Sequence, residues 1–184
     1  MPQNGLESYI RFLKGETSAL EELVRTYSDS LTRFAYCYLN DSALAEDIME
    51  ESFAIFIVKR KHFNDENHLR AYLYKIARNK SIDYLRWRGR EVFLSDMEEV
   101  FANSNTEENI IKMERDKKVY ACMQKLPEQY REVLYLSFFD DFHTEEICRI
   151  MKKSKKQIYN LLARSKAALK EILLKEGITH EDIY

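Results

Sequence analysis

Apolar residues recur at intervals of three and four positions along most of the chain, which is the spacing of amphipathic helices. In the first half this spacing predicts four helices, which lie before Gly15, from about Ser18 to Tyr38, from about Ser42 to Lys61 and from about His68 to Trp87. The polar segment 64–67 is expected to form a loop between the last two. Helices joined by such short connections favour a compact bundle over residues 1–90.

The predicted core of this bundle consists of the periodic apolar residues Leu20, Leu23, Val24, Tyr27, Leu31, Phe34, Ala35, Tyr38, Leu44, Ala45, Ile48, Ile55, Phe56, Leu69, Leu73, Ile76 and Ala77. Helical periodicity fades at 91–108, a segment that holds six acidic residues and neither Lys nor Arg. The sequence therefore predicts an all-α fold, in which this acidic linker joins the first domain to a second helical domain at 109–184.

The second domain begins with a helix from about Asn105 to Lys125, and Pro127 fits the first turn of the next one. Residues 144–174 then have the pattern of a helix-turn-helix, with Thr144 expected to cap its short first helix. In its second helix Ile158, Leu161, Leu162, Leu169 and Ile172 are expected to be buried.

Two pairs of residues have the spacing of a capping box, in which a Ser and a Glu or Gln three positions later satisfy each other's backbone N–H groups. Ser18 and Glu21 form one pair at the start of the second helix, and Ser154 and Gln157 form the other at the start of the last helix. Both helices are predicted to begin with this motif.

The net charge of −2 conceals a strong segregation of charge along the chain. Residues 16–51 hold nine acidic and two basic residues, whereas residues 59–90 hold three acidic and ten basic ones. Residues 144–176 are again basic, with nine basic and four acidic residues. Separate acidic and basic surfaces indicate separate partners.

The basic character of the helix-turn-helix is concentrated at Lys152, Lys153, Lys155 and Lys156, around the start of its second helix. Cations at a helix N-terminus oppose the macrodipole, at about 0.3–1 kcal/mol each when exposed. A phosphate backbone would turn this repulsion into attraction. The alternative is a solvated basic surface.

Cations and aromatic rings alternate on the fourth helix of the first domain. Its polar residues Lys75, Asn79, Asp83, Arg86 and Arg90 share one face, and Tyr72, Tyr74, Tyr84 and Trp87 lie among them. Cations that follow a backbone and rings that stack on bases are what single-stranded nucleic acid requires. The alternative is that the tyrosines belong to the core.

The third helix carries the opposite charge, because Asp47, Glu50 and Glu51 lie on one face at offsets of zero, three and four. The two interpretations are a solvated face and a docking surface for a basic protein. The chain lacks the short motifs of nucleotide-binding, metalloprotease and hydrolase sites, and its four histidines are scattered. We therefore expect a protein that is not an enzyme and needs no cofactor or metal.

The cysteines indicate the cellular compartment. The chain has only three, Cys37, Cys122 and Cys148, which are widely spaced and lie among apolar residues. Such residues are expected to be buried free thiols in a reducing compartment. The chain also lacks an apolar run of the length that a membrane span requires. These features predict a cytoplasmic protein that does not insert into membranes.

Segments 45–53 (AEDIMEESF), 69–86 (LRAYLYKIARNKSIDYLR) and 126–136 (LPEQYREVLYL), with the helix-turn-helix, resemble an extracytoplasmic-function (group IV) sigma factor of the bacterial sigma-70 family. The resemblance implies that the first domain (region 2) binds core RNA polymerase and melts and reads the −10 promoter element. It implies that the second domain (region 4) reads the −35 element, and that an anti-sigma factor holds the protein inactive.

The resemblance also implies roles for individual residues. Core polymerase is expected to contact Asp47, Glu50, Glu51 and Phe53. The −10 element is expected to contact Asn64, Asp65, Glu66, Asn67, Lys75, Arg78, Asn79, Asp83, Arg86 and Trp87, with a flipped base captured at 64–67. The −35 element is expected to contact Lys155, Lys156, Gln157, Tyr159, Asn160, Arg164 and Lys166.

Two other functions remain open from the sequence. A helix-turn-helix regulator that acts without core polymerase would explain 144–174 but neither the acidic surface at Asp47 nor the aromatic surface at Trp87. A helical adaptor that binds only protein would leave the lysines around Ser154 unexplained.

Overall fold

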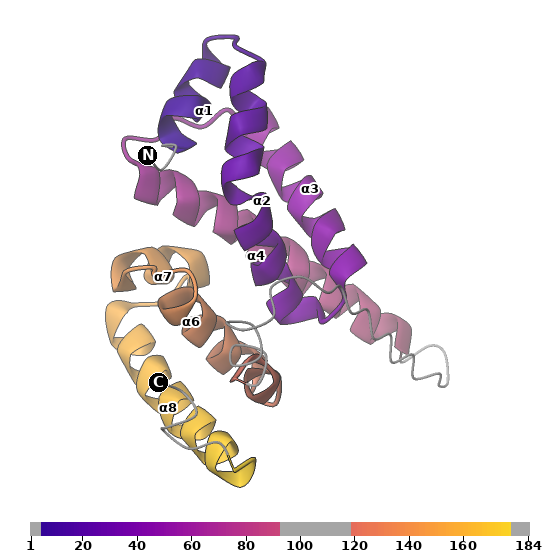
Figure 1. Cartoon of the computed structure of the whole chain (residues 1–184), viewed down its shortest axis with the longest axis vertical. Coiled ribbons are helices and arrows are strands. Elements are labelled where there is room, and N and C mark those ends of the chain that lie inside the picture. The colour runs from indigo at the N-terminus through magenta and orange to yellow at the C-terminus, as the bar shows by residue number, and fades with distance from the viewer. Residues whose placement is uncertain (1–4, 93–118, 178–184) are drawn as a thin grey trace. The chain divides into compact units, whose positions relative to one another are not determined.

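The computed structural model describes residues 5–92 and 119–177, and all regular structure within these ranges is helical, as predicted (Figure 1). The chain divides into two compact units, which we describe separately. The first contains α1 (Gly5–Leu13), α2 (Ser18–Leu39), α3 (Ser42–Lys59) and α4 (Glu66–Val92). The second contains helical residues 119–124, α6 (Glu128–Phe138), α7 (Thr144–Met151) and α8 (Lys155–Lys175).

The predicted linker, 91–108, lies outside the described residues except for its first two positions, which are the last turn of α4. The predicted helix over 105–125 is described only from residue 119, where the chain is helical to residue 124. The proposed domain boundaries therefore stay predictions.

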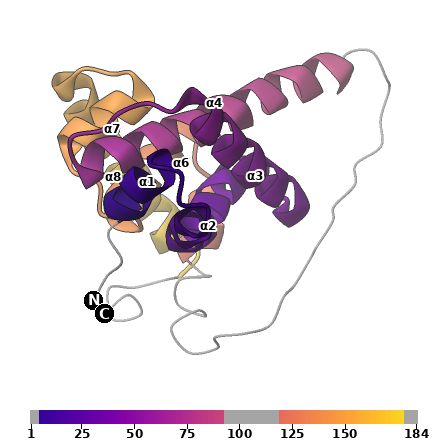
Figure 2. The ribbon, with the colours of Figure 1, turned by 90° about the horizontal axis from the view of Figure 1, so that it is seen from above.

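The core of the first unit is built around α2, which contacts each of α1, α3 and α4 and lies between α1 and α3 (Figures 1 and 2). Most of the predicted core positions are buried. Leu20, Val24, Leu44 and Ile55 are half-buried instead, because they lie at the margins of the buried faces. The 3.6-residue period therefore predicted the face of each helix that packs inward.

The start of α2 differs from its prediction, because Ser18 and Glu21 do not form a capping box. Thr17 precedes the helix, has helical backbone angles and makes no side-chain capping bond. The Ser18 hydroxyl donates a hydrogen bond to Glu16 Oε1 instead, at 3.2 Å. In contrast, Asp41 caps α3 by accepting a hydrogen bond from the Leu44 N–H at 3.1 Å.

In the second unit, the residue at the capping position of α7 is His143, so the prediction that Thr144 is the cap was wrong by one residue. Thr144 lies inside α7, and the His143 N–H donates to Glu146 Oε2 at 2.7 Å. The predicted capping box of α8 is confirmed, since Ser154 Oγ accepts from the Gln157 N–H and Gln157 Oε1 accepts from the Ser154 N–H. Between the two helices Lys152 has a φ of 55°, the left-handed conformation that glycine adopts most easily.

The cysteines agree with the prediction of free thiols. Cys37 and Cys122 are buried and Cys148 is half-buried, and none of the three forms a disulfide bond. Burial raises the pKa of the Cys122 thiol and of the Cys148 thiol. Within the described ranges, no helix combines the length and the apolar character that a membrane crossing demands.

Candidate nucleic-acid and polymerase interfaces

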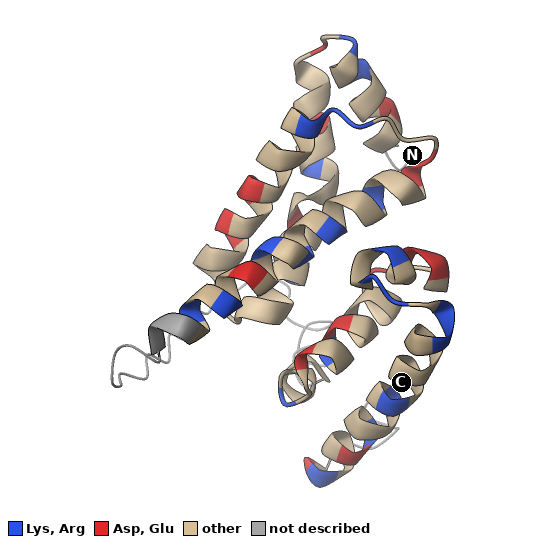
Figure 3. Cartoon of the chain, turned by 180° about the vertical axis from the view of Figure 1, so that it is seen from behind, with Lys and Arg blue, Asp and Glu red and all other residues tan. Residues whose placement is uncertain are grey.

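An acidic surface runs along α3, as predicted. We call it the α3 acidic surface and define it as Glu46, Asp47, Glu50 and Glu51, whose side chains are all exposed. Figure 3 shows acidic positions along this helix. Phe53 does not belong to it, because its side chain is only 4% exposed and packs inside the unit. The expectation that Phe53 contacts core polymerase therefore stays a prediction, and the buried ring contributes to packing within the unit.

The α3 acidic surface is linked to α4 by an ion pair that sequence analysis missed. Lys80 Nζ lies 2.9 Å from Glu51 Oε2. The two residues are far apart in the chain, so the helical period contained no signal for this pair. An exposed pair of this kind stabilises the fold by only about 0–1 kcal/mol. A cation of a partner can therefore compete with Lys80 for Glu51.

The predicted loop at 64–67 ends two residues earlier than expected, because α4 already begins at Glu66. Asp65 Oδ1 accepts a hydrogen bond from the His68 N–H at 2.8 Å, and this bond is the main reason that the pKa of Asp65 is lowered. Asn64 and Asn67 are exposed. Asp65 thus stabilises the first turn of α4 with a side chain that is itself 48% exposed, and the two asparagines are also accessible.

Glu66 is half-buried, and its carboxylate contacts the protein. Its Oε2 accepts a hydrogen bond from the Leu6 N–H, at 2.5 Å, in the first turn of α1. Burial raises the pKa of Glu66, although the backbone N–H groups of α1 oppose that shift. A contact between Glu66 and DNA therefore stays a prediction, because its carboxylate already holds α1.

The aromatic residues of α4 divide into core and surface. Tyr74 is buried with its ring 4.9 Å from Phe34, so it is not a stacking platform. The half-buried Tyr72 lies 5.4 Å from the Phe63 ring and 4.7 Å below Lys61 Nζ. Lys61 and Phe63 belong to the segment before α4, and the sequence analysis had not singled them out.

Trp87 is the most exposed aromatic side chain of α4, with 54% of its surface exposed. The Tyr84 ring lies 5.9 Å away and supports one side of it. Arg86 is also exposed and lies 3.7 Å from Asp83. Toward the start of the helix Lys75, Arg78 and Asn79 are half-buried. The exposed end of α4 therefore combines a ring with cations, as Figure 3 shows by the basic residues along this helix.

The start of α8 presents a polar surface. Ile158 is buried and Leu161 and Leu162 are half-buried, which leaves Lys156, Tyr159, Asn160 and Arg164 exposed. A hollow in this surface is lined by Lys153, Gln157, Asn160, Leu161 and Arg164. Gln157, Asn160 and Arg164 come from consecutive turns of α8, and Lys153 precedes that helix. This arrangement suits contacts along a groove.

Two cations of the α8 set have partners within the second unit. Lys155 Nζ lies 2.5 Å from Glu145 Oε1, and this contact raises the pKa of Lys155. Lys166 Nζ lies 5.0 Å above the Phe138 ring of α6, which makes a cation–π contact. Lys156 and Arg164 are therefore the better candidates for phosphate contacts.

Two family models match the chain, Sigma-70 region 2 over residues 23–91 and Sigma-70 region 4 over residues 116–169. The extracytoplasmic-function RNA polymerase sigma factor SigM of Bacillus subtilis is 29% identical over 164 residues, covering 88% of this chain and 99% of that protein. A probable RNA polymerase sigma factor of Haemophilus influenzae is 25% identical over 189 residues, covering 92% and 97% respectively.

Solved structures of similar fold include the sigma factor RpoE of Bartonella quintana in complex with the anti-sigma factor NepR. That structure has a TM-score of 0.69 and 23% sequence identity, and the likeness covers 83% of this chain and 95% of RpoE. CnrH in complex with the cytosolic domain of CnrY has a TM-score of 0.68 and 19% identity, covering 93% and 97%. The two family matches and the relatives agree with the residue patterns and the all-helical fold, and the chain belongs to the extracytoplasmic-function sigma factors of the sigma-70 family.

Proposed function

We propose that this sigma factor docks on core RNA polymerase through the α3 acidic surface and directs it to promoters through the exposed ends of α4 and α8. The observation that carries the proposal is the separation of charge between these elements. Carboxylates are exposed on α3, cations and a tryptophan on the end of α4, and polar and cationic groups on the start of α8. Opposite charges on separate helices allow protein and DNA to be bound at the same time.

At the −10 element, Trp87 and Arg86 engage unpaired bases and their backbone. The exposed indole offers a stacking surface, and the guanidinium follows the phosphates. Asn79 lies nearer the start of the same helix, and Asn64 and Asn67 lie where the flipped base is expected. Lys75, Arg78 and Asp83 complete the set on α4.

At the −35 element, Lys156 and Arg164 contact phosphates, and Asn160 reads a base. An Asn side chain makes two hydrogen bonds with adenine in the major groove, which discriminates by about 1–3 kcal/mol. Tyr159, with 55% of its surface exposed, lies beside Asn160 on the same side of α8. Gln157 contributes less, because its side chain is used in the capping box.

The partners follow from the same assignment. Core polymerase and promoter DNA place the protein in the cytoplasm, and the chain itself has a binding role and no catalytic one. The solved structures of RpoE with NepR and of CnrH with CnrY support an anti-sigma factor as a further partner. The region 2 match over 23–91 disfavours a regulator that acts without polymerase.

Reconstitution with bacterial core RNA polymerase tests the proposal. The purified chain is expected to form a complex with core enzyme and to produce run-off transcripts from a limited set of genomic fragments. Core enzyme alone provides the control. A chain that binds the same fragments without core polymerase, and yields no transcripts with it, would contradict the proposal.

Alanine substitutions on α8 are expected to separate phosphate contacts from base contacts. Lys156→Ala and Arg164→Ala should each weaken binding to all sequences and reduce the slope of log affinity against log salt by about one. Lys155→Ala, the matched control, should change the slope less because Glu145 already pairs with Lys155. Asn160→Ala should instead relax the preference at one base position with little change in slope.

Selection from a randomised −35 element by the reconstituted holoenzyme measures both effects. If the Asn160→Ala holoenzyme selects the same sequences as wild type, Asn160 does not read a base. Tyr159 would then be the next candidate on that side of the helix.

A further inference from the structure

Helix α1 contacts both ends of the segment that precedes α4, residues 60–65. At the first end, the Tyr9 hydroxyl donates a hydrogen bond to the Lys61 carbonyl at 2.8 Å. At the other end, Glu66 Oε2 accepts a hydrogen bond from the Leu6 N–H. Tyr9 is only 1% exposed, so the donor side of this part-buried bond is protected from competing water. Burial also raises the pKa of Tyr9, so its hydroxyl keeps its proton at neutral pH and remains a donor.

Ring contacts fill the space between these two bonds. The Tyr9 ring lies 4.8 Å from that of Phe56 and 5.7 Å from that of Phe63. Phe63 in turn contacts Tyr72 of α4. The Arg60 guanidinium lies 5.7 Å above the Phe12 ring, and Arg60 has a φ of 42°, which an arginine rarely adopts. The segment therefore takes its conformation from α1 and α4.

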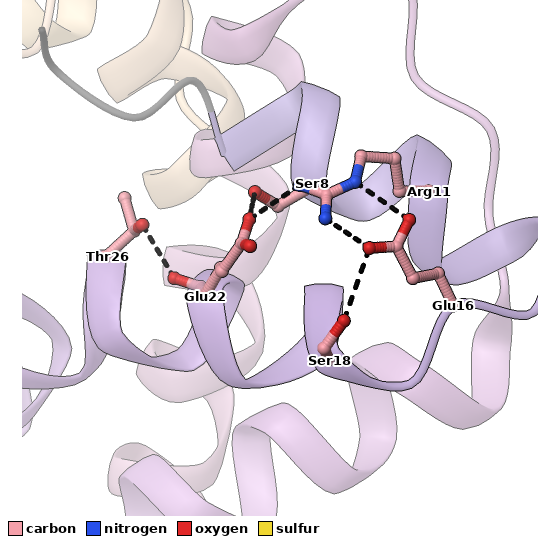
Figure 4. A network of polar contacts seen from close by, with 6 residues as sticks. All are labelled: Ser8, Arg11, Glu16, Ser18, Glu22 and Thr26. Atoms are coloured by element: carbon pink, nitrogen blue, oxygen red, sulfur yellow. Dashed lines mark hydrogen bonds and ion pairs between the residues drawn. The ribbon is translucent and has the colours of Figure 1, made fainter.

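Helix α1 is itself fixed on α2 by a polar network (Figure 4). Arg11 Nη1 donates to Glu22 Oε2 at 2.8 Å, and Arg11 also pairs with Glu16. The Ser8 hydroxyl donates to Glu22 Oε2 at 2.9 Å, and this bond is the largest cause of the lowered pKa of Glu22. A bridging guanidinium with two carboxylates holds an orientation better than a single ion pair does.

The first turn of α1 also lies close to the Tyr27 ring of α2. A Cβ atom on Gly5 would lie 2.4 Å from the Tyr27 hydroxyl oxygen of α2, a distance that no side chain tolerates. The first turn of α1 therefore packs closely against Tyr27, and a larger residue at position 5 would require that ring to move. The region 2 family match begins at residue 23, so α1 lies outside the matched segment.

We propose that α1 holds segment 60–65 in the conformation that receives the −10 strand. In this proposal Tyr9 and Glu66 are the positioning residues. The inference rests on the proposed function, because Asn64 in this segment lies where the flipped −10 base is expected. Neither Tyr9 nor Glu66 contacts DNA in this account. They act by keeping Phe63 and Asn64 in one conformation before DNA arrives, which lowers the entropic cost of binding.

Comparison of Tyr9→Phe with Tyr27→Phe tests the inference. Both replacements remove one buried hydroxyl from the same unit, but among the described residues the Tyr27 hydroxyl has no hydrogen-bond partner. Backbone hydrogen exchange in the full-length protein measures the order of 60–65. Tyr9→Phe is expected to accelerate exchange there by about 2- to 12-fold, the factor that one buried hydrogen bond supplies, whereas Tyr27→Phe should not. Glu66→Ala should also accelerate it, and Glu66→Gln should not because Gln keeps an acceptor oxygen.

The functional arm uses holoenzyme made from each variant and a −10 non-template-strand oligonucleotide from a promoter found by run-off transcription. Tyr9→Phe is expected to lower oligonucleotide affinity by about the same 2- to 12-fold factor, with unchanged affinity for core polymerase. Unchanged exchange in Tyr9→Phe would overturn the inference, and so would accelerated exchange with unchanged oligonucleotide affinity. If wild-type holoenzyme binds no such oligonucleotide, the proposed function fails, whatever the exchange data show.

Discussion

Reversing the charge of Asp47 and Glu50 together is expected to reduce the affinity for core RNA polymerase by at least about 100-fold while leaving the fold intact. Both side chains are exposed on α3. Placing like charges against each other in an interface costs several kcal/mol, whereas surface changes usually alter folding stability by no more than about 0.5 kcal/mol. Titration of core enzyme with labelled Asp47→Lys/Glu50→Lys protein measures the affinity, and circular dichroism with thermal melting measures the fold.

The matched control is Asp29→Lys with Glu171→Lys, which changes the net charge equally at exposed positions on α2 and α8. Glu51 is left unchanged, because its reversal would place a lysine beside Lys80 and disturb the contact between α3 and α4. Wild-type affinity in the Asp47→Lys/Glu50→Lys protein would mean that the α3 acidic surface is only solvated. Equal loss in the control would mean that net charge, and no specific contact, determines binding.

The helices and their buried faces could be predicted from the sequence because both depend on local order. Apolar residues three and four positions apart define a stripe regardless of what it packs against. The end of α4 was less predictable: it was expected near Trp87 and lies at Val92. Gly89 weakens a helix by only about 1 kcal/mol, and without a proline the helix continues.

The two predicted capping boxes show that a local motif does not decide by itself which hydrogen bonds form. Ser18 and Ser154 have the same motif, but only Ser154 forms a capping box. At α2 the carboxylate of Glu16, held by Arg11 from another helix, takes the Ser18 hydroxyl. The motif supplies the geometry, and a competing partner decides whether it is used.

The contacts that the sequence did not reveal join residues far apart in the chain. Tyr9 and Lys61 are 52 positions apart, and Leu6 and Glu66 are 60 positions apart. Neither pair belongs to one helix, so no periodicity relates their positions. For the same reason Glu66, acidic and next to a polar loop, resembled a surface residue although its carboxylate binds α1. A single sequence indicates which residues face inward but not which of them meet.

Replacing Trp87 with alanine is expected to reduce open-complex formation on a duplex promoter by about 5- to 150-fold, with closed-complex binding nearly unchanged. Stacking of a base on an aromatic ring contributes about 1–3 kcal/mol, and bases become available only after the strands separate. Trp87 has 54% of its surface exposed, so the replacement removes little core packing. Permanganate footprinting measures opening, and filter binding at low temperature measures the closed complex.

A premelted bubble template separates stacking from other causes of this loss. Because its bases are already unpaired, Trp87→Ala holoenzyme should recover most of its activity on the bubble, and Trp87→Phe should retain activity on both templates because a ring remains. Val58→Ala is the control for exposure, since it removes another exposed apolar side chain from the same unit. Equal losses on duplex and bubble would show that Trp87 acts before strand separation, and the stacking role on α4 would then pass to Tyr84, whose ring lies 5.9 Å from the indole.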